Sequence, residues 1–145
     1  MTNNSLLSKI IINNLINETP PFDLASFITS ICSLLTIKID HIEFTLLSSQ
    51  DIHKMNLDHF NVDSDTDTIS FNLSPTTIVT GDVYICPDVI KKNAIEFNET
   101  YEKEYKIVII HSVLHLIGYT DDNQKSLNEM TTKQNQVYDQ LHEKD

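Results

Sequence analysis

Residues 111–121 read HSVLHLIGYTD, and this segment predicts a metal site at the end of a buried helix. In a helix with 3.6 residues per turn, side chains four positions apart lie on one face, so His111 and His115 can present two imidazoles to one ion. Gly118 is one of only two glycines in the chain. It stands where a helix needs a residue that tolerates positive φ in order to end and turn back.

The reversed chain is expected to bring Asp121 or Asp122 round as a third ligand. Two histidines and a carboxylate, with a fourth position left for water, form a known catalytic zinc arrangement. The alternative is a pair of ordinary, partly buried core histidines. The spacing also matches the long zincin motif, but Ser112 stands where those peptidases carry a general-base glutamate. Since serine cannot take a proton as a carboxylate does, peptidase chemistry is disfavoured.

The composition predicts one compact domain over residues 1–145. The chain has 145 residues, of which 40% are hydrophobic, enough for a core. The N-terminal MTNNSLLSKIIINNL lacks a basic leader and a small-residue cleavage site, so it is not expected to be a signal peptide, and no segment is apolar enough to cross a membrane. Two distant cysteines, Cys32 and Cys86, suit buried free thiols in a reducing compartment. The expected location is cytoplasmic.

The charge disfavours simple nucleic-acid binding. The formal net charge is −11, which predicts repulsion from a polyanion. All ten basic residues are lysine, so no arginine is present to grip phosphate with two parallel hydrogen bonds. Any RNA-binding function must overcome both features.

Hydrophobic periodicity predicts strands interleaved with helices. Helices are expected over 23–35, 48–57, 87–97, 99–117 and 123–142, and strands over 41–47, 68–72 and 81–86, with a connecting loop over 73–80. Ser48 and Asp51 have the spacing of a capping box, and Pro87 suits the first turn of a helix. The predicted fold class is α+β (α/β-like), with a small mixed sheet flanked by helices and the metal site at the end of the long buried helix.

Three segments resemble the YbeY family of bacterial endoribonucleases and ribosomal RNA maturation factors. The first comprises Met55-Asn56 and residues 63–71 (DSDTDTISF), the second is residues 81–86 (GDVYIC), and the third is the histidine segment through Tyr119. They occur in the family's order and at similar spacing. Both glycines fall where the family pattern has one. The resemblance spans about residues 55–121.

The resemblance implies a single-strand-specific, metal-dependent endoribonuclease acting in maturation of the 16S rRNA 3′ end and in ribosome quality control. His111, His115 and Asp121 would bind one zinc ion, although nickel, manganese or iron would also accept these ligands. A water activated by the metal would be the nucleophile. Asp67 and Ser70 are candidate cleft residues, with a turn or strand role as the alternative for each. The expected partners are single-stranded rRNA and the ribosomal subunit or its proteins, with no membrane.

Three departures from the family pattern bear on activity. Asp121 replaces the usual third histidine, which lowers the net charge of a metal-loaded site from about +2 to about +1. Ser112 replaces a glycine. Phe60 replaces the arginine that would be the natural phosphate clamp. An alternative function is therefore a ribosome-assembly binding factor with a structural metal and little or no cleavage; a second alternative is another small metal-dependent hydrolase.

The remaining polar residues carry weaker expectations. Asp82 could orient a ligand histidine from behind. Thr66 is expected to be a structural hydroxyl at a turn. The four other histidines are expected to be ordinary surface or strand-end residues; they are His41, His53, His59 and His142. A local basic strip or a merely solvated surface could be formed by four lysines, namely Lys91, Lys92, Lys103 and Lys106.

Overall fold

The computed structural model describes residues 6–143, and the first five residues of the N-terminal stretch discussed above lie outside it. A four-stranded sheet has the order β1-β2-β4-β3. The strands are β1 (Ile10–Asn14), β2 (Ile39–Leu46), β3 (Thr68–Asn72) and β4 (Val79–Ile85). The pairs β1–β2 and β2–β4 are parallel, and β3–β4 is antiparallel. The sheet is therefore mixed and the fold is α+β, as predicted.

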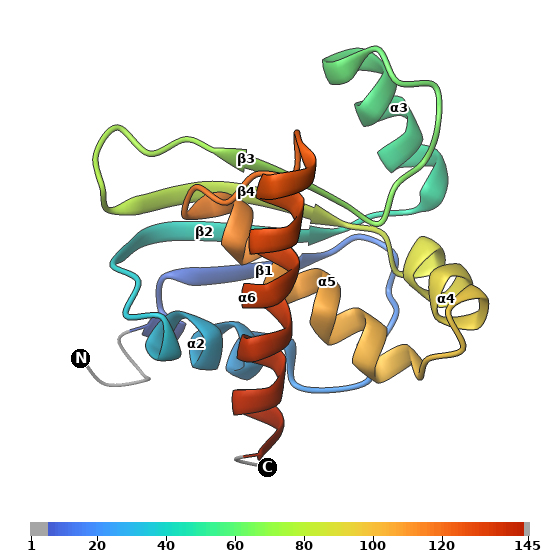
Figure 1. The fold of residues 1–145 in the computed structure, drawn as a ribbon. Coiled ribbons are helices and arrows are strands. Elements are labelled where there is room, and N and C mark those ends of the chain that lie inside the picture. Colours follow the sequence, from blue (N-terminus) through green and yellow to red (C-terminus); the bar gives the residue numbers. More distant parts are fainter. Residues whose placement is uncertain (1–5, 144–145) are drawn as a thin grey trace.

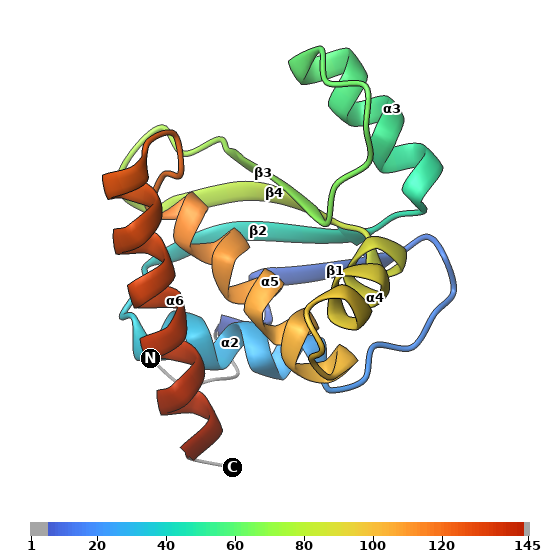
Figure 2. The same cartoon turned by 45° about the vertical axis from the view of Figure 1, so that its right-hand side comes forward.

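Helices α2 (Leu24–Leu34) and α5 (Tyr101–Leu116) pack on one face of this sheet, and α6 (Gln124–Glu143) packs against both of them (Figure 1). Figure 2 shows α5 lying between the sheet and α6, with α2 beneath both. The main core lies in this layer and includes residues from Leu6 to Leu141. Among the described residues, no helix is both long and apolar enough to cross a bilayer.

The other face of the sheet is covered only in part. Helix α3 (Ser49–Phe60) projects from the end of the sheet, and α4 (Pro87–Glu96) connects β4 to the segment before α5 (Figure 1). A second, smaller buried cluster lies under α3 and includes Ile52 and Ile69. The Ser48 hydroxyl accepts a hydrogen bond from the Asp51 N–H, which confirms the predicted cap of α3.

Several elements differ from the sequence-based expectation. Strand β2 begins two residues before its predicted start, and α3 ends three residues beyond its predicted end. Strand β1 was not predicted, because only Ile10 and Ile12 face the core and two asparagines end the strand. In a short edge strand with one buried face, apolar and polar residues alternate over too few positions to predict a strand. Strand β4 begins at Val79, two residues before the predicted start, so the loop predicted over 73–80 is too long.

The contact between β4 and α5 depends on Gly81. A Cβ atom at this position would lie 2.7 Å from Leu116 Cδ2 and 3.0 Å from the Phe71 carbonyl oxygen. A Cβ atom at 2.7 Å would force the Leu116 side chain to shift, so glycine allows the last turn of α5 to lie this close to the sheet. This contact fixes the end of the helix that carries the two histidines.

Candidate metal centre

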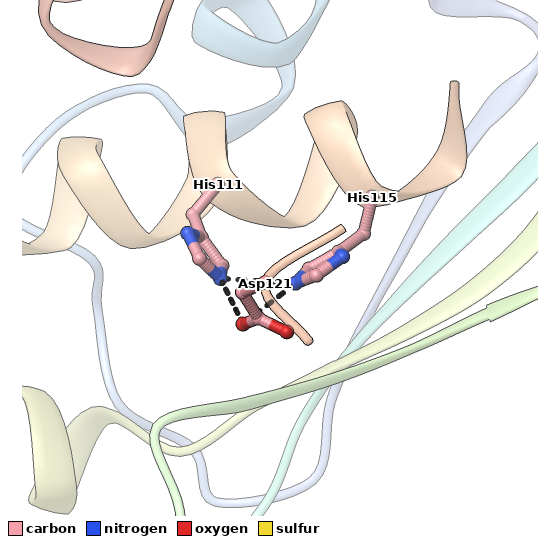
Figure 3. A group of neighbouring side chains, drawn as sticks. All are labelled: His111, His115 and Asp121. Atoms are coloured by element: carbon pink, nitrogen blue, oxygen red, sulfur yellow. Dashed lines mark hydrogen bonds and ion pairs between the residues drawn. The ribbon is translucent and has the colours of Figure 1, made fainter. Parts of the chain in front are cut away.

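The end of α5 turns as the sequence predicted. Gly118 has φ of +106°, in the region that favours glycine. The Gly118 N–H donates to the His115 carbonyl and the Tyr119 N–H donates to the Leu114 carbonyl, which satisfies carbonyl groups at the end of the helix. The chain then reverses and brings Asp121 back beside the helix (Figure 3).

The geometry of the three predicted ligands fits a single ion. His111 Nε2 and His115 Nε2 are 3.0 Å apart, and Asp121 Oδ2 lies 3.7 and 3.5 Å from these two atoms. Ligands about 2.0–2.1 Å from a tetrahedral zinc ion would lie about 3.3 Å from one another. Of the acidic, histidine and cysteine side chains in residues 6–143, these three form the only group with ligand atoms close enough to hold a metal.

Hydrogen bonds behind the two rings aim their Nε2 atoms at this centre. His115 Nδ1 lies 3.0 Å from the Tyr119 carbonyl oxygen, and His111 Nδ1 lies 3.0 Å from Gln134 Oε1. Because both partners are acceptors, each neutral ring carries its proton on Nδ1. Two Nε2 lone pairs then face each other, an arrangement that a cation between them would stabilise.

The protonation of His111 also suits a metal ligand. Burial is the main cause that lowers its pKa, and the neighbouring His115 lowers it further, while Gln134, Asp67 and Asp121 act in the opposite direction. A lowered pKa keeps the imidazole neutral at pH 7. Metal binding requires the neutral ring, so this environment favours binding at physiological pH.

Position favours Asp121 over Asp122 as the candidate third ligand. Asp121 faces the histidines, whereas Asp122 Oδ1 accepts a hydrogen bond from the Thr120 hydroxyl and is not part of the ligand group. Asp121 is half exposed, so the centre is open to solvent on that side.

A cleft of about 520 Å³ opens beside the three ligand residues. Its lining comes from α3, β3, α5 and the turns around them: Asn56, Phe60, Thr66, Asp67, Thr68, Ile69, Ser70, Asn72, His111, His115, Gly118, Tyr119, Thr120 and Asp121. A larger hollow of about 670 Å³ lies between α2 and α6 but contains none of the candidate ligands. Of these two cavities, only the smaller cleft is lined by the candidate metal ligands, so it is the candidate substrate-binding site.

Both weaker candidates lie in this cleft. Burial raises the pKa of the Asp67 carboxyl, and the nearby His111 only partly opposes this shift. The Thr66 hydroxyl is 3.4 Å from Asp67 Oδ1, consistent with the structural role predicted for Thr66. The Ser70 hydroxyl is 3.4 Å from the Ser112 carbonyl oxygen and so faces α5. A raised pKa makes Asp67 better suited than an exposed aspartate to exchange a proton near pH 7.

Ser112 is completely buried and points away from the ligands. Its hydroxyl lies 2.8 Å from the Thr68 hydroxyl and 2.8 Å from the Val108 carbonyl oxygen. It joins α5 to β3. At the position where zincins carry a catalytic glutamate, this chain therefore has a serine that connects α5 to β3.

For two other groups of polar residues, the structure favours one of the open possibilities. Asp82 cannot orient a ligand histidine: its neighbours Gly81 and Val83 face α5, so Asp82 lies on the opposite face of the sheet. For the four lysines, the structure fits the alternative of a solvated surface, since three of them form ion pairs with glutamates. Ion pairs join Lys91 to Glu18, Lys103 to Glu99 and Lys106 to Glu102, at 2.7, 3.3 and 3.8 Å.

The other histidines lie outside the cleft, as expected. His41 pairs with Glu43, His53 pairs with Asp63, and His142 stacks on Tyr138. His59 contacts the edge of Phe71. None of these four lines the cleft.

Sequence reasoning missed Gln134, the partner of His111. A local signal was present: Met130, Val137 and Leu141 form the buried stripe of α6, and Gln134 occupies the same face between them. A polar residue within an apolar stripe needs a buried hydrogen-bond partner. The Tyr119 carbonyl could not have been found this way, since every residue carries one.

Comparison with known proteins identifies relatives across most of the chain. Residues 12–142 match the family model described as endoribonuclease YbeY. A protein named endoribonuclease YbeY from Chloroherpeton thalassium is 44% identical over 58% of this chain, and one from Thermotoga maritima is 35% identical over 70%. The aligned regions span 60% and 67% of these relatives' own lengths.

A solved structure supports the same grouping. The solution structure of a protein from Thermotoga maritima superposes with a TM-score of 0.56 and 25% identity, covering 93% of each chain. The family model, the named relatives and the shared fold agree. The chain therefore belongs to the YbeY family.

Proposed function

We propose that the protein is a metal-dependent endoribonuclease that hydrolyses phosphodiester bonds in single-stranded regions of ribosomal RNA. The observation that carries the proposal is the group of three ligand atoms, from His111, His115 and Asp121, all within 4.8 Å of one another on the wall of an open cleft. Relatives at 30–44% identity are named endoribonucleases, which supports RNA as the substrate.

Family membership supports a proposal for the finer biological role. We infer maturation of the 16S rRNA 3′ end and ribosome quality control, with the ribosomal subunit or its proteins as partners. Two buried free cysteines support a cytoplasmic location. A core that includes residues from Leu6 to Leu141 supports a single domain over residues 1–145.

We assign one zinc ion to His111, His115 and Asp121. Bound there, a divalent ion supplies Lewis-acid activation of water or of a phosphoryl oxygen. The chain's own contribution is orientation: Gln134 and the Tyr119 carbonyl hold the rings, and the turn at Gly118 holds the carboxylate. Asp67 is the candidate for exchanging a proton with the substrate, and Ser70 for contacting it.

Cleavage of a labelled single-stranded RNA by nuclease-free protein tests this function. We expect cleavage that a chelator abolishes and added zinc restores, and that is lost in His115→Ala. His41→Ala is the matched control, since His41 lies outside the cleft and should leave cleavage unchanged. Equal cleavage by the wild type and His115→Ala would contradict the proposal.

The second candidate function is a non-catalytic ribosome-assembly factor. The net charge of −11 favours it, as does the absence of any lysine from the described lining of the cleft. This function predicts binding to ribosomal partners that His115→Ala does not alter, with no cleavage in either protein. A third candidate, another small metal-dependent hydrolase, would show turnover of a non-RNA substrate. Peptidase activity is the least favoured form, because Ser112 is buried against β3.

A further inference from the structure

An exposed aromatic ring stands on the wall of the metal cleft. Phe60 is the last residue of α3, half of its surface is exposed (50%), and it lines the same cleft as the three ligand residues. We propose that the open face of Phe60 stacks on a nucleobase of an RNA strand bound in this cleft. This inference rests on the proposed function and names how the substrate is held.

The ring has one covered face and one available face. Phe71 lies parallel to Phe60, with ring centroids 5.8 Å apart and an interplanar angle of 9°. A parallel neighbour covers only one face of a ring, so the exposed half of Phe60 includes its other face. An aromatic face open to solvent beside a cleft is the kind of surface on which unpaired bases stack.

The Phe60 ring has aromatic neighbours that restrict its rotamers: Phe71 is stacked on it, and the His59 ring lies 6.4 Å away. Phe71 is itself contacted edge-on by Tyr84 at 6.0 Å and by His59 at 5.4 Å. On the helix side, Asn61 adopts the left-handed conformation and ends α3 directly after Phe60. A ring that is already ordered loses little conformational entropy when a base stacks on it.

The charges of the cleft favour such an uncharged contact. No lysine is present in the described lining, and the chain has no arginine. Ionic contacts to phosphate from the cleft wall are therefore missing, apart from those of a bound metal. Stacking does not depend on charge and tolerates every base. A volume of about 520 Å³ is within the range of clefts that hold small ligands.

Tryptophan fluorescence tests the stacking directly, because the chain contains no tryptophan. Phe60→Trp introduces a single fluorophore at the site, and Phe97→Trp is the matched control at an exposed phenylalanine (59%) that does not line the cleft. Metal-loaded protein is titrated with a 2′-O-methyl oligoribonucleotide that resists cleavage. We expect quenching in Phe60→Trp, none in Phe97→Trp, and none in either protein with an abasic oligonucleotide.

Affinity gives an independent measurement. We expect Phe60→Leu, which removes the aromatic face but stays apolar, to weaken binding of the same oligonucleotide by about fivefold or more. Phe97→Leu should not change it. Circular dichroism confirms that each variant is folded. Unquenched tryptophan with unchanged affinity in Phe60→Leu would overturn the proposal and leave Phe60 as a contact for a protein partner.

The outcomes separate this inference from the proposed hydrolysis. Base-dependent quenching in a protein that cleaves no RNA supports stacking and contradicts the nuclease function. Cleavage of RNA without quenching, together with equal affinity of Phe60→Leu and the wild type, supports the nuclease function and contradicts stacking. Failure of the wild-type protein to bind the oligonucleotide at all overturns the stacking proposal as well.

Discussion

At the scale of single residues, the proposed metal centre depends on a side chain and a backbone carbonyl that would not touch the ion themselves. The Gln134 side chain accepts a hydrogen bond from His111 Nδ1, and the Tyr119 carbonyl accepts one from His115 Nδ1. Such outer partners fix the tautomer and direction of a ligand ring, so their loss lowers metal affinity even when every ligand is still present.

Replacing Gln134 measures this contribution. We expect Gln134→Leu to lower zinc affinity by about 10- to 100-fold, because His111 loses the acceptor that fixes its proton on Nδ1. Competition with a chromophoric chelator at fixed pH reports the change. Gln136→Leu is the matched control on the exposed side of α6. Equal affinities in both variants would show that Gln134 does not orient the ligand.

The pH dependence of metal binding follows from the pKa of His111. Burial lowers this pKa, so the ring stays neutral to lower pH than an exposed histidine. The proton competes with the metal only below that pKa. We therefore expect zinc affinity to stay level as the pH falls from 8 to 7 and to drop under more acidic conditions, measured by the same competition assay. An affinity that already falls steeply between pH 8 and 7 would contradict the assignment.

Cysteine chemistry offers a separate residue-scale prediction. Cys32 is completely buried, and burial raises its pKa to about 12. Since the thiolate is the reactive form, only about one molecule in ten thousand would carry it at pH 8. We expect neither Cys32 nor the buried Cys86 to react with a thiol reagent in the native protein, and both to react after unfolding in urea. Rapid reaction in the native state would contradict the predicted burial.

At the scale of elements, the close contact of α5 with β4 sets the position of the ligand helix. Gly81→Ala would place a methyl group against Leu116, at a cost of about 1–3 kcal/mol of stability. Leu116→Ala alone should cost about 2–5 kcal/mol. In the double variant, the loss of stability should be smaller than the sum of the two single losses. The reason is that the two Leu116 Cδ atoms cause most of the clash with a Cβ at position 81.

Urea unfolding of the four proteins measures this coupling. Gly81→Ala combined with Leu141→Ala, a core substitution on α6, is the control and should be additive. Full additivity in the Gly81–Leu116 pair would mean that the Phe71 carbonyl, 3.0 Å from the new Cβ, causes the strain instead.

Elements with strong local signals were predictable from the sequence. The α5 helix, its end at Gly118 and the return of an acidic residue follow from spacing and from the conformational freedom of glycine, whereas the choice of Asp121 over Asp122 came from the family resemblance. Strand β1 was missed, since a short edge strand beside asparagines carries little periodicity. The role of Asp82 stayed open because its face of the sheet depends on the register of β4 against α5, a tertiary feature. Gln134 joins His111 across 23 positions, which local spacing cannot predict.

At the scale of the whole molecule, the acidic charge limits how the RNA substrate proposed for this protein could bind. The chain has 21 acidic and 10 basic residues. Three of the lysines form ion pairs with glutamates, and none lines the described cleft. Binding through phosphate contacts releases counterions and weakens steeply with salt, with a slope of about −0.7 for each phosphate neutralised on a single strand. A cleft without lysine should neutralise almost none.

We therefore expect RNA affinity to be nearly independent of salt. Anisotropy of a labelled, uncleavable oligoribonucleotide, measured from 50 to 200 mM KCl, should give a slope of log affinity against log salt shallower than about −1. Phe60→Leu should shift the whole line to weaker binding without changing its slope, since stacking releases no counterions. A slope steeper than about −2 would mean that lysines outside the cleft neutralise phosphates on a longer stretch of RNA. In that case charge distant from the metal centre, and not the aromatic wall beside it, would supply most of the affinity.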